Sequence, residues 1–184
     1  MPSLFMDLVR PHIEEAIEQA QLTNPLISRV TRGEKFWFEE PGRRVQFEFG
    51  DFRVEAETTQ TQLLIEVDST SIDITNLVKY WYMLDRHFTH PGIRARKVIL
   101  LHIYQQCETN QEGSGQNYFS RVQLWEYLSP IIRERLNGRF EATMHPVRTF
   151  GKDCAIEGHD AESLSRAIEA LECAFTLLAS PQTH

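Results

Sequence analysis

Residues 50–68, GDFRVEAETTQTQLLIEVD, contain two alternating segments that are separated by a polar loop. In the first segment, residues 52–57, the apolar residues Phe, Val and Ala alternate with Arg and Glu. The second segment, residues 62–68, also alternates, with Leu63, Ile65 and Val67 on one face. A period of two with one apolar face is typical of a half-buried β-strand. The stretch therefore predicts an antiparallel hairpin with a polar face and a core face.

The register of this hairpin brings acidic residues together. Asp51 lies opposite Glu66 if the loop has two residues and opposite Asp68 if it has four. Glu55 and Glu57 lie farther along the same face. Like charges this close repel one another, so the arrangement requires a cation, a proton or a neighbouring base. Carboxylates suit Mg²⁺ or Mn²⁺, although alternating acids are also typical of the solvated face of a sheet.

Upstream of the hairpin, the sequence predicts a helix over residues 3–22, because Val9, Ile13 and Ile17 recur at helical spacing. The helix also carries Pro11, which is expected either to start its regular part or to kink it. Asn24-Pro25 then breaks the chain.

Residues 36–40 and 45–49 predict two further strands around the turn Pro41-Gly42, with one aromatic face. Folding about residues 42 and 43 places Phe38 opposite Phe47 and Phe36 opposite Phe49. The pair Gly50-Asp51 is typical of a type II′ turn, so we expect a second reversal there. That reversal would pair Glu48 with Arg53 across the strands, and it makes residues 35–68 a meander of four strands.

Downstream of residue 68, the pattern predicts alternating helices and strands. The first helix is capped by Asp73 or Thr75 and runs to about Phe88, with an apolar stripe of Leu77, Trp81, Leu84 and Phe88. A buried strand over residues 97–104 and a loop over residues 107–117 follow. The remaining elements are a helix from about Tyr118 to Leu136, a strand from Phe140 to Val147, and a last helix capped by Asp160.

This order of elements predicts the α/β (α+β) class, with a mixed central sheet flanked by helices. An antiparallel meander forms one half of the sheet, and β-α-β units form the other. The sequence contains no linker long enough to separate two domains, so residues 1–184 are expected to form a single domain.

Composition narrows the classes of function. The 19 Lys and Arg residues against 26 Asp and Glu residues leave a net charge of −7, which disfavours a nonspecific nucleic-acid coat. No apolar run approaches a membrane span, and the N-terminus lacks the pattern of a secretory signal. Three scattered cysteines without a CxxC motif favour a reducing, cytoplasmic environment.

The stretches Gly50-Asp51-Phe52-Arg53-Val54 and Leu64-Ile65-Glu66-Val67-Asp68 have a pattern beyond their alternation. An acid begins one strand, and the next strand ends in two hydrophobic residues, a glutamate and one further residue. The following helix and the strand VILLHIY complete the order. This pattern resembles the PD-(D/E)XK nuclease superfamily over about residues 4–148. The resemblance implies a restriction-endonuclease-like fold and hydrolysis of phosphodiesters in nucleic acid, with Mg²⁺ or Mn²⁺ at Asp51, Glu66 and Asp68.

The sequence departs from this superfamily at two positions. Gly50 replaces the usual proline, and Asp68 replaces the usual lysine, which orients water and offsets charge. In some members a lysine of the neighbouring helix takes that role, and the resemblance implies Lys79 here. However, Lys79 lies nearly opposite the apolar stripe of its helix, which favours an ordinary solvated lysine. The resemblance also implies an acid from the first helix, either Glu14 or Glu18.

Three hypotheses follow for the function. The first is a Mg²⁺- or Mn²⁺-dependent nuclease that uses Asp51, Glu66, Asp68 and Lys79. The second is a catalytically inactive nuclease fold that binds a protein partner, which the aspartate at position 68 favours. The third is an acidic, chaperone-like interaction module, resembling type III secretion chaperones, which would form a homodimer.

Overall fold

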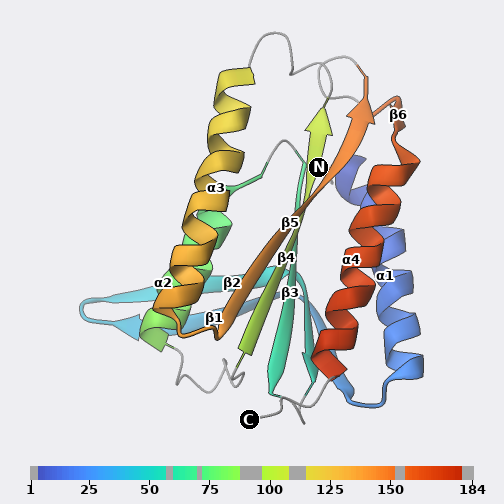
Figure 1. Ribbon diagram of the computed structural model, residues 1–184. Coiled ribbons are helices and arrows are strands. Elements are labelled where there is room, and N and C mark those ends of the chain that lie inside the picture. The colour runs from blue at the N-terminus through green and yellow to red at the C-terminus, as the bar shows by residue number, and fades with distance from the viewer. Residues whose placement is uncertain are drawn as a thin grey trace.

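The computed structural model describes residues 4–56, 60–69, 72–87, 97–107, 115–151 and 156–179. Within them, four helices and a six-stranded sheet form three layers, with the sheet in the middle (Figure 1). The strands are β1 (Ile27–Glu40), β2 (Arg43–Ala56), β3 (Thr61–Asp68), β4 (Lys97–Cys107), β5 (Phe140–Phe150) and β6 (Gly158–His159). The helices are α1 (Leu4–Thr23), α2 (Ile74–His87), α3 (Gly115–Arg135) and α4 (Ala161–Ala179).

The sheet has the order β1-β2-β3-β4-β5-β6 and is mixed. Strands β1, β2 and β3 pair antiparallel, β3, β4 and β5 pair parallel, and β6 pairs antiparallel with β5. Helix α2 connects β3 to β4 and α3 connects β4 to β5, as parallel neighbours require. The α+β class and the mixed sheet that the sequence predicted are confirmed.

Two apolar cores lie on opposite faces of the sheet. The first joins α1 and α4 to the sheet and includes Phe5, Ile13, Phe52, Ile65, Leu101, Leu164 and Leu171. The second joins α2 and α3 to the sheet and to the outer part of the β1–β2 hairpin. It includes Phe38, Phe47, Phe49, Leu64, Leu77, Leu100, Trp125 and Phe140. Figure 1 shows α1 and α4 on one side of the sheet and α2 and α3 on the other.

The expected four-stranded meander is wrong, because β2 continues through Gly50-Asp51 without reversing. The expected turn is a β-bulge, in which Gly50 and Asp51 of β2 lie opposite Gly33 alone. Gly50 has a φ of +58°, which the expected turn would also have required. However, the strand that pairs with β2, β1, begins at Ile27 and not at residue 36 as predicted. Strand β1 is therefore long enough to pair with both halves of β2, and the positive φ produces a bulge instead of a turn.

The bulge changes the pairing expected from the turn. The predicted Glu48–Arg53 pair is wrong: Glu48 lies 3.9 Å from Lys35, whereas Arg53 is buried and forms ion pairs with Glu34, at 3.1 Å, and with Glu55. Arg53 also lies over the rings of two phenylalanines. A buried guanidinium between two carboxylates needs these partners, because removing a charge from water is costly.

The register of the outer hairpin also differs from the prediction. The turn lies at residues 41 and 42, so Phe36 pairs with Phe47 and Phe38 pairs with Val45. The aromatic face is nevertheless present, because a shift of two residues preserves alternation. The rings of Phe36 and Phe49 contact each other edge to face, with centroids 5.0 Å apart.

The predicted helices are present with altered ends. Helix α1 contains Pro11 and α3 contains Pro130, and each continues through its proline. Helix α3 begins at Gly115, three residues before the predicted start. The expected cap of α4 is confirmed, because the Asp160 Oδ1 accepts a hydrogen bond from Glu162 N at 3.1 Å. None of these helices, over the residues described, has the length and apolar character that a membrane span requires.

Candidate functional site

The predicted acids lie on the face of the sheet that α2 and α3 cover. Strand β2 pairs with β3 in the register Phe52 to Ile65, which continues to place Asp51 opposite Glu66. This is the register predicted for a two-residue loop. Asp68 follows Glu66 by two residues and therefore shares its face. We call Asp51, Glu66 and Asp68 the acidic cluster.

Asp51 lies at the bulge and contacts the neighbouring strand. Its Oδ2 accepts a hydrogen bond from the backbone N of Val67 at 2.8 Å. Burial raises the pKa of Asp51 to about 6; the Val67 N–H opposes this rise, and the charges of Glu66 and Asp68 increase it. The neighbouring carboxylates thus add to the effect of burial in disfavouring the charged form of Asp51, and a bound cation would relieve this repulsion.

Glu66 is almost fully buried, and its Oε1 has two partners from α2. The Nζ of Lys79 lies 2.9 Å from this oxygen, and the hydroxyl of Tyr80 also hydrogen-bonds to it. The Tyr80 hydroxyl in turn accepts a hydrogen bond from Gly50 N at 2.6 Å. Burial, and then the charge of Glu66, raise the pKa of Tyr80 well above its usual value, so the phenol is protonated at neutral pH.

Lys79 is directed toward the acidic cluster rather than into solvent. Its side chain is 30% exposed, and its ammonium lies 4.6 Å from the ring centroid of Tyr80 and 5.7 Å from that of Phe47. The interpretation of Lys79 as an ordinary solvated lysine is therefore wrong. A lysine stem spans several ångströms along apolar surface, so a position beside the stripe still lets the charge reach the sheet.

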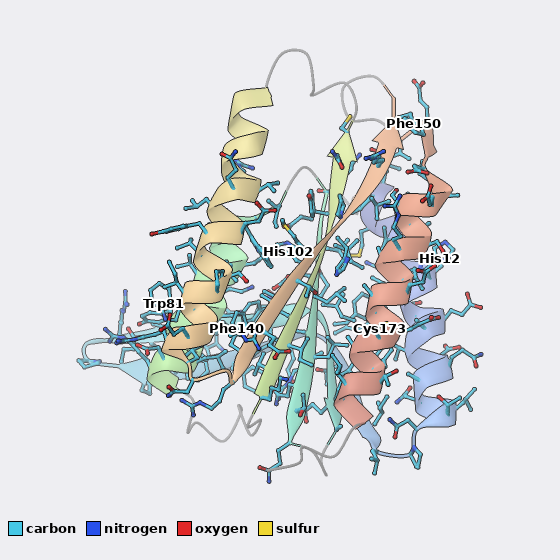
Figure 2. All side chains as sticks on the ribbon, in the orientation of Figure 1. His12, Trp81, His102, Phe140, Phe150 and Cys173 are labelled. Atoms are coloured by element: carbon cyan, nitrogen blue, oxygen red, sulfur yellow. The ribbon has the colours of Figure 1, made fainter. Side chains whose placement is uncertain are left out.

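Asp68 joins β3 to its neighbours. Its Oδ2 accepts a hydrogen bond from Asp73 N, just before α2, at 2.7 Å, and it also contacts the Nε2 of His102 on β4. His102 is fully buried. Its label in Figure 2 lies beside the strands of the sheet. Among the described residues, the Nδ1 of His102 has no hydrogen-bond partner, so only one of the two ring nitrogens is bonded.

The donor set is suited to a hard cation, but the side chains do not form a preformed cage. Among the described residues, no group of three or more His, Cys, Asp or Glu side chains is arranged to hold a metal ion. Mg²⁺ commonly uses only one or two protein carboxylates and keeps several waters. Asp51 and Glu66 lie opposite each other across two strands, and they are the carboxylates from which such a site would be built.

Other acids named from the sequence lie elsewhere. Helix α1 covers the opposite face of the sheet, where Glu14 pairs with Arg32 at 3.1 Å and Glu18 is exposed. The expectation that one of them completes the site is wrong, because the sheet separates them from the cluster. Glu55 is engaged by Arg53, and Glu57 lies outside the described residues.

Tyr80 is a further residue of this site, and it was not predicted from the sequence. Leu77 and Leu84 of the expected stripe are buried, Trp81 is half-buried and Phe88 lies outside the described residues. Tyr80 lies three residues after Leu77 and is fully buried, so the same helical spacing could have included it. A tyrosine at a core position signals a polar partner, because a buried hydroxyl needs one.

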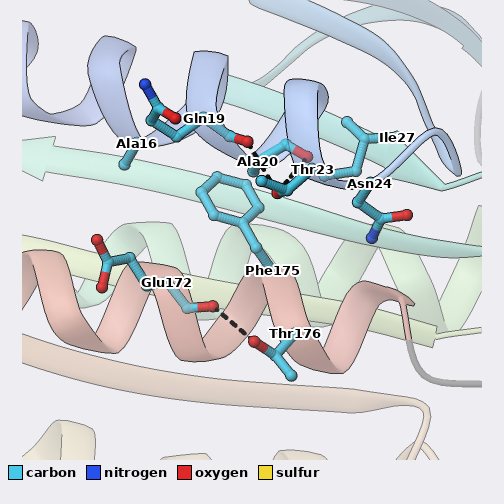
Figure 3. A pocket seen from close by; sticks show the side chains of 9 residues that line it. All are labelled: Ala16, Gln19, Ala20, Thr23, Asn24, Ile27, Glu172, Phe175 and Thr176. Atoms are coloured by element: carbon cyan, nitrogen blue, oxygen red, sulfur yellow. Dashed lines mark hydrogen bonds between the residues drawn. The ribbon is translucent and has the colours of Figure 1, made fainter.

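A groove of about 480 Å³ lies on the other face of the sheet, between α1 and α4 (Figure 3). Phe175 projects into it from α4. The hydroxyls of Thr23 and Thr176 hydrogen-bond to backbone oxygens of their own helices, at 2.8 Å and 3.2 Å. None of the residues of the acidic cluster lines this groove, so it is a separate surface.

Comparison with known proteins adds little to this geometry. No protein-family model matches the chain, and the search of curated proteins finds no significant relative. One solved structure, that of protein VC1899 from Vibrio cholerae, is similar with a TM-score of 0.47 and 13% identity. The match covers 92% of this chain and 33% of that one, so this chain spans about a third of its length. A likeness this distant supports no conclusion about activity.

Proposed function

We propose that the protein is a metal-dependent nuclease with a restriction-endonuclease-like fold. Asp51, Glu66 and Asp68 would hold Mg²⁺ or Mn²⁺, and the substrate would be a phosphodiester of nucleic acid. The observation that carries this proposal is the contact of Lys79 with Glu66, which lies opposite Asp51. Burial, and then the charges of Glu66 and Asp68, raise the pKa of Asp51.

The protein residues would divide the work as follows. The carboxylates of Asp51 and Glu66 provide negative charge at the point where β2 and β3 pair, and Asp68 extends it toward β4. A bound Mg²⁺ or Mn²⁺ would supply activated water and offset charge on the phosphate. The ammonium of Lys79 lies beside these acids and would stabilise negative charge that develops on the substrate.

The position of Lys79 supports this reading despite the aspartate at position 68. A lysine at position 68 would extend from the same face of β3 as Glu66. Lys79 brings an ammonium to Glu66 from α2 instead, 2.9 Å from Oε1. Phosphodiester hydrolysis would require a positive charge beside Glu66, and this charge can come from a strand or from a helix.

The direct test is cleavage of labelled DNA and RNA by the purified protein with Mn²⁺. We expect cleavage by the wild type, with losses of at least 100-fold in Asp51→Asn and Glu66→Gln. Glu162→Gln is the matched control, because Glu162 is an exposed acid on α4, behind the sheet. Equal cleavage by all four proteins would indicate a contaminant, and no cleavage by the wild type would remove the nuclease proposal.

A second candidate is a module that binds a protein partner, either as an inactive nuclease fold or as an acidic chaperone. The favouring observation is an apolar row on the outer face of α3, where Leu124, Tyr127 and Ile131 are each at least 40% exposed. Such rows mark interaction surfaces more often than single exposed residues do. Light scattering of the wild type and of Tyr127→Glu tests this candidate. A homodimer that dissociates in the variant would favour it, and a monomer in both would oppose self-association.

We further propose a cytoplasmic location on the basis of the cysteines. Cys107 and Cys173 are both free thiols, one buried and one exposed. Exposed thiols persist in a reducing compartment. Thiol labelling of Cys173 in freshly lysed cells tests this, and a blocked thiol would contradict it.

A further inference from the structure

We propose that Tyr80 is a positioning residue of the proposed metal site, whose hydroxyl links the backbone next to Asp51 to the carboxylate of Glu66. This inference rests on the proposed function and adds a residue that neither the sequence pattern nor the resemblance assigns. Tyr80 itself is fully buried, so it acts through the two acids and not on a substrate.

The hydroxyl of Tyr80 connects two strands through one atom. It accepts the hydrogen bond from Gly50 N at 2.6 Å and donates its own proton to Glu66 Oε1. Gly50 belongs to β2 and Glu66 to β3, and Tyr80 comes from the helix that covers both. One side chain thereby fixes the spacing between the backbone next to Asp51 and the carboxylate of Glu66.

On the side of β2, this contact determines the position of Asp51. Gly50 adopts a φ of +58°, and a Cβ at this position would lie 2.7 Å from the backbone oxygen of Phe52. The bulge is therefore a tight backbone conformation that only glycine fits without strain. Because Asp51 is the next residue, a bond that holds Gly50 N also orients the start of the Asp51 side chain.

On the side of β3, the contact determines which oxygen of Glu66 is engaged. The two donors from α2, Lys79 and Tyr80, both use Oε1. A carboxylate held through one oxygen presents its second oxygen in a defined direction. Partners that orient ligating carboxylates in this way typically change metal affinity by 10- to 100-fold when they are removed.

The ring of Tyr80 gives the hydroxyl a fixed direction. It packs against Phe47 and Phe49, with centroids 5.9 Å and 6.1 Å away. Replacing the tyrosine by phenylalanine preserves these ring contacts and removes only the oxygen. Tyr80→Phe therefore separates the role of the hydroxyl from that of the aromatic core.

The test is calorimetric titration of the 184-residue chain with Mn²⁺, well below the unfolding temperature of each variant. We expect Tyr80→Phe to bind Mn²⁺ at least tenfold more weakly than the wild type. Tyr82→Phe is the matched control, because Tyr82 lies on the same helix and its hydroxyl also contacts a glutamate, Glu40, away from the cluster. The control should bind Mn²⁺ as the wild type does.

A second readout monitors the geometry without metal. Amide hydrogen exchange at Gly50 should accelerate at least tenfold in Tyr80→Phe relative to Tyr82→Phe, because its N–H loses its acceptor. A purely structural role would lower the unfolding temperature and leave Mn²⁺ affinity unchanged.

The outcomes separate this inference from the proposed function. If the wild type binds Mn²⁺ and Tyr80→Phe binds it equally well, the positioning role is overturned and the metal site stands. If the wild type does not bind Mn²⁺, the metal-dependent function fails, and the positioning role fails with it. Weaker binding in Tyr80→Phe together with faster exchange at Gly50 supports the proposal.

Discussion

The two faces of the central sheet bury different kinds of side chain. The face under α1 and α4 is packed by aliphatic and aromatic residues, and its buried polar groups, such as Gln105 and Thr149, are neutral and bonded to each other at 2.8 Å. The face under α2 and α3 has an apolar core as well, yet it also buries Glu66, Arg53 and the ring of His102.

This difference separates a face that only packs apolar and neutral groups from a face that also buries charge. Buried charges contribute little net stability, because desolvation offsets the attraction between partners. One face of the sheet satisfies the requirements of folding with apolar contacts. On the other face, Glu66 lies beside Lys79 and Tyr80 and close to the charges of Asp51 and Asp68. The proposed function would give this arrangement of charges a chemical role.

The largest effect is expected where packing alone is removed. Leu171→Ala on the α1–α4 face should destabilise the protein by about 3 kcal/mol, because it deletes a fully buried side chain and leaves a cavity. Chemical denaturation measures this change. Leu177→Ala, an exposed position on the same helix, should change stability by less than about 0.5 kcal/mol. The Mn²⁺ affinity of Leu171→Ala should remain that of the wild type, and a loss would show that the two faces are coupled.

A smaller loss of stability is expected when the ammonium of Lys79 is removed from beside the acidic cluster. Lys79→Met should destabilise the metal-free protein by about 1 kcal/mol, because Glu66 keeps a buried charge without its partner and Lys79 is only partly exposed. Lys35→Met is the control, since Lys35 is exposed and lies 3.9 Å from Glu48. Equal stability of Lys79→Met and the wild type would restore the view of Lys79 as a solvated residue.

The third effect is of similar size, has the opposite sign and depends on pH. Because folding raises the pKa of Asp51 to about 6, the folded state binds more protons than the unfolded state between about pH 4 and pH 6. The metal-free protein therefore loses stability as the pH rises through this window. Asp51→Asn escapes this loss and should be more stable than the wild type by about 1 kcal/mol at pH 7, with no gain near pH 4.

Thermal unfolding at pH 4, 5, 6 and 7 measures the effect of Asp51→Asn. Asp85→Asn serves as the control, because Asp85 is an exposed acid near Arg135 at 3.8 Å. If Asp51→Asn is less stable than the wild type at pH 7, the carboxylate is favourably solvated and the acids do not strain one another.

Much of the fold was predictable because it depends on patterns among residues that are close in the sequence. The alternation of residues 52–57 and 62–68 predicts β3 and the inner half of β2, and the shorter of the two loops considered places Asp51 opposite Glu66. The cap at Asp160 follows from the preference of aspartate for the position just before a helix. These features are local, so the amino-acid sequence determines them directly.

The meander was mispredicted because a glycine with positive φ serves turns and bulges alike. Whether a turn or a bulge forms depends on the strand that pairs with β2. Residues 27–34 of β1 have no clear apolar alternation, so the sequence did not predict this part of the strand. The direction of Lys79 depends in the same way on what α2 packs against.

By itself, then, the sequence determined the order of the elements downstream of residue 60, the apolar faces and the shared face of the three acids on two paired strands. Tertiary structure decided that β2 runs on through Gly50, that Lys79 and Tyr80 meet Glu66, and that His102 meets Asp68. The physical reason is range: periodicity and capping act within a few residues, whereas these contacts join side chains 13 to 34 positions apart through the docking of whole elements.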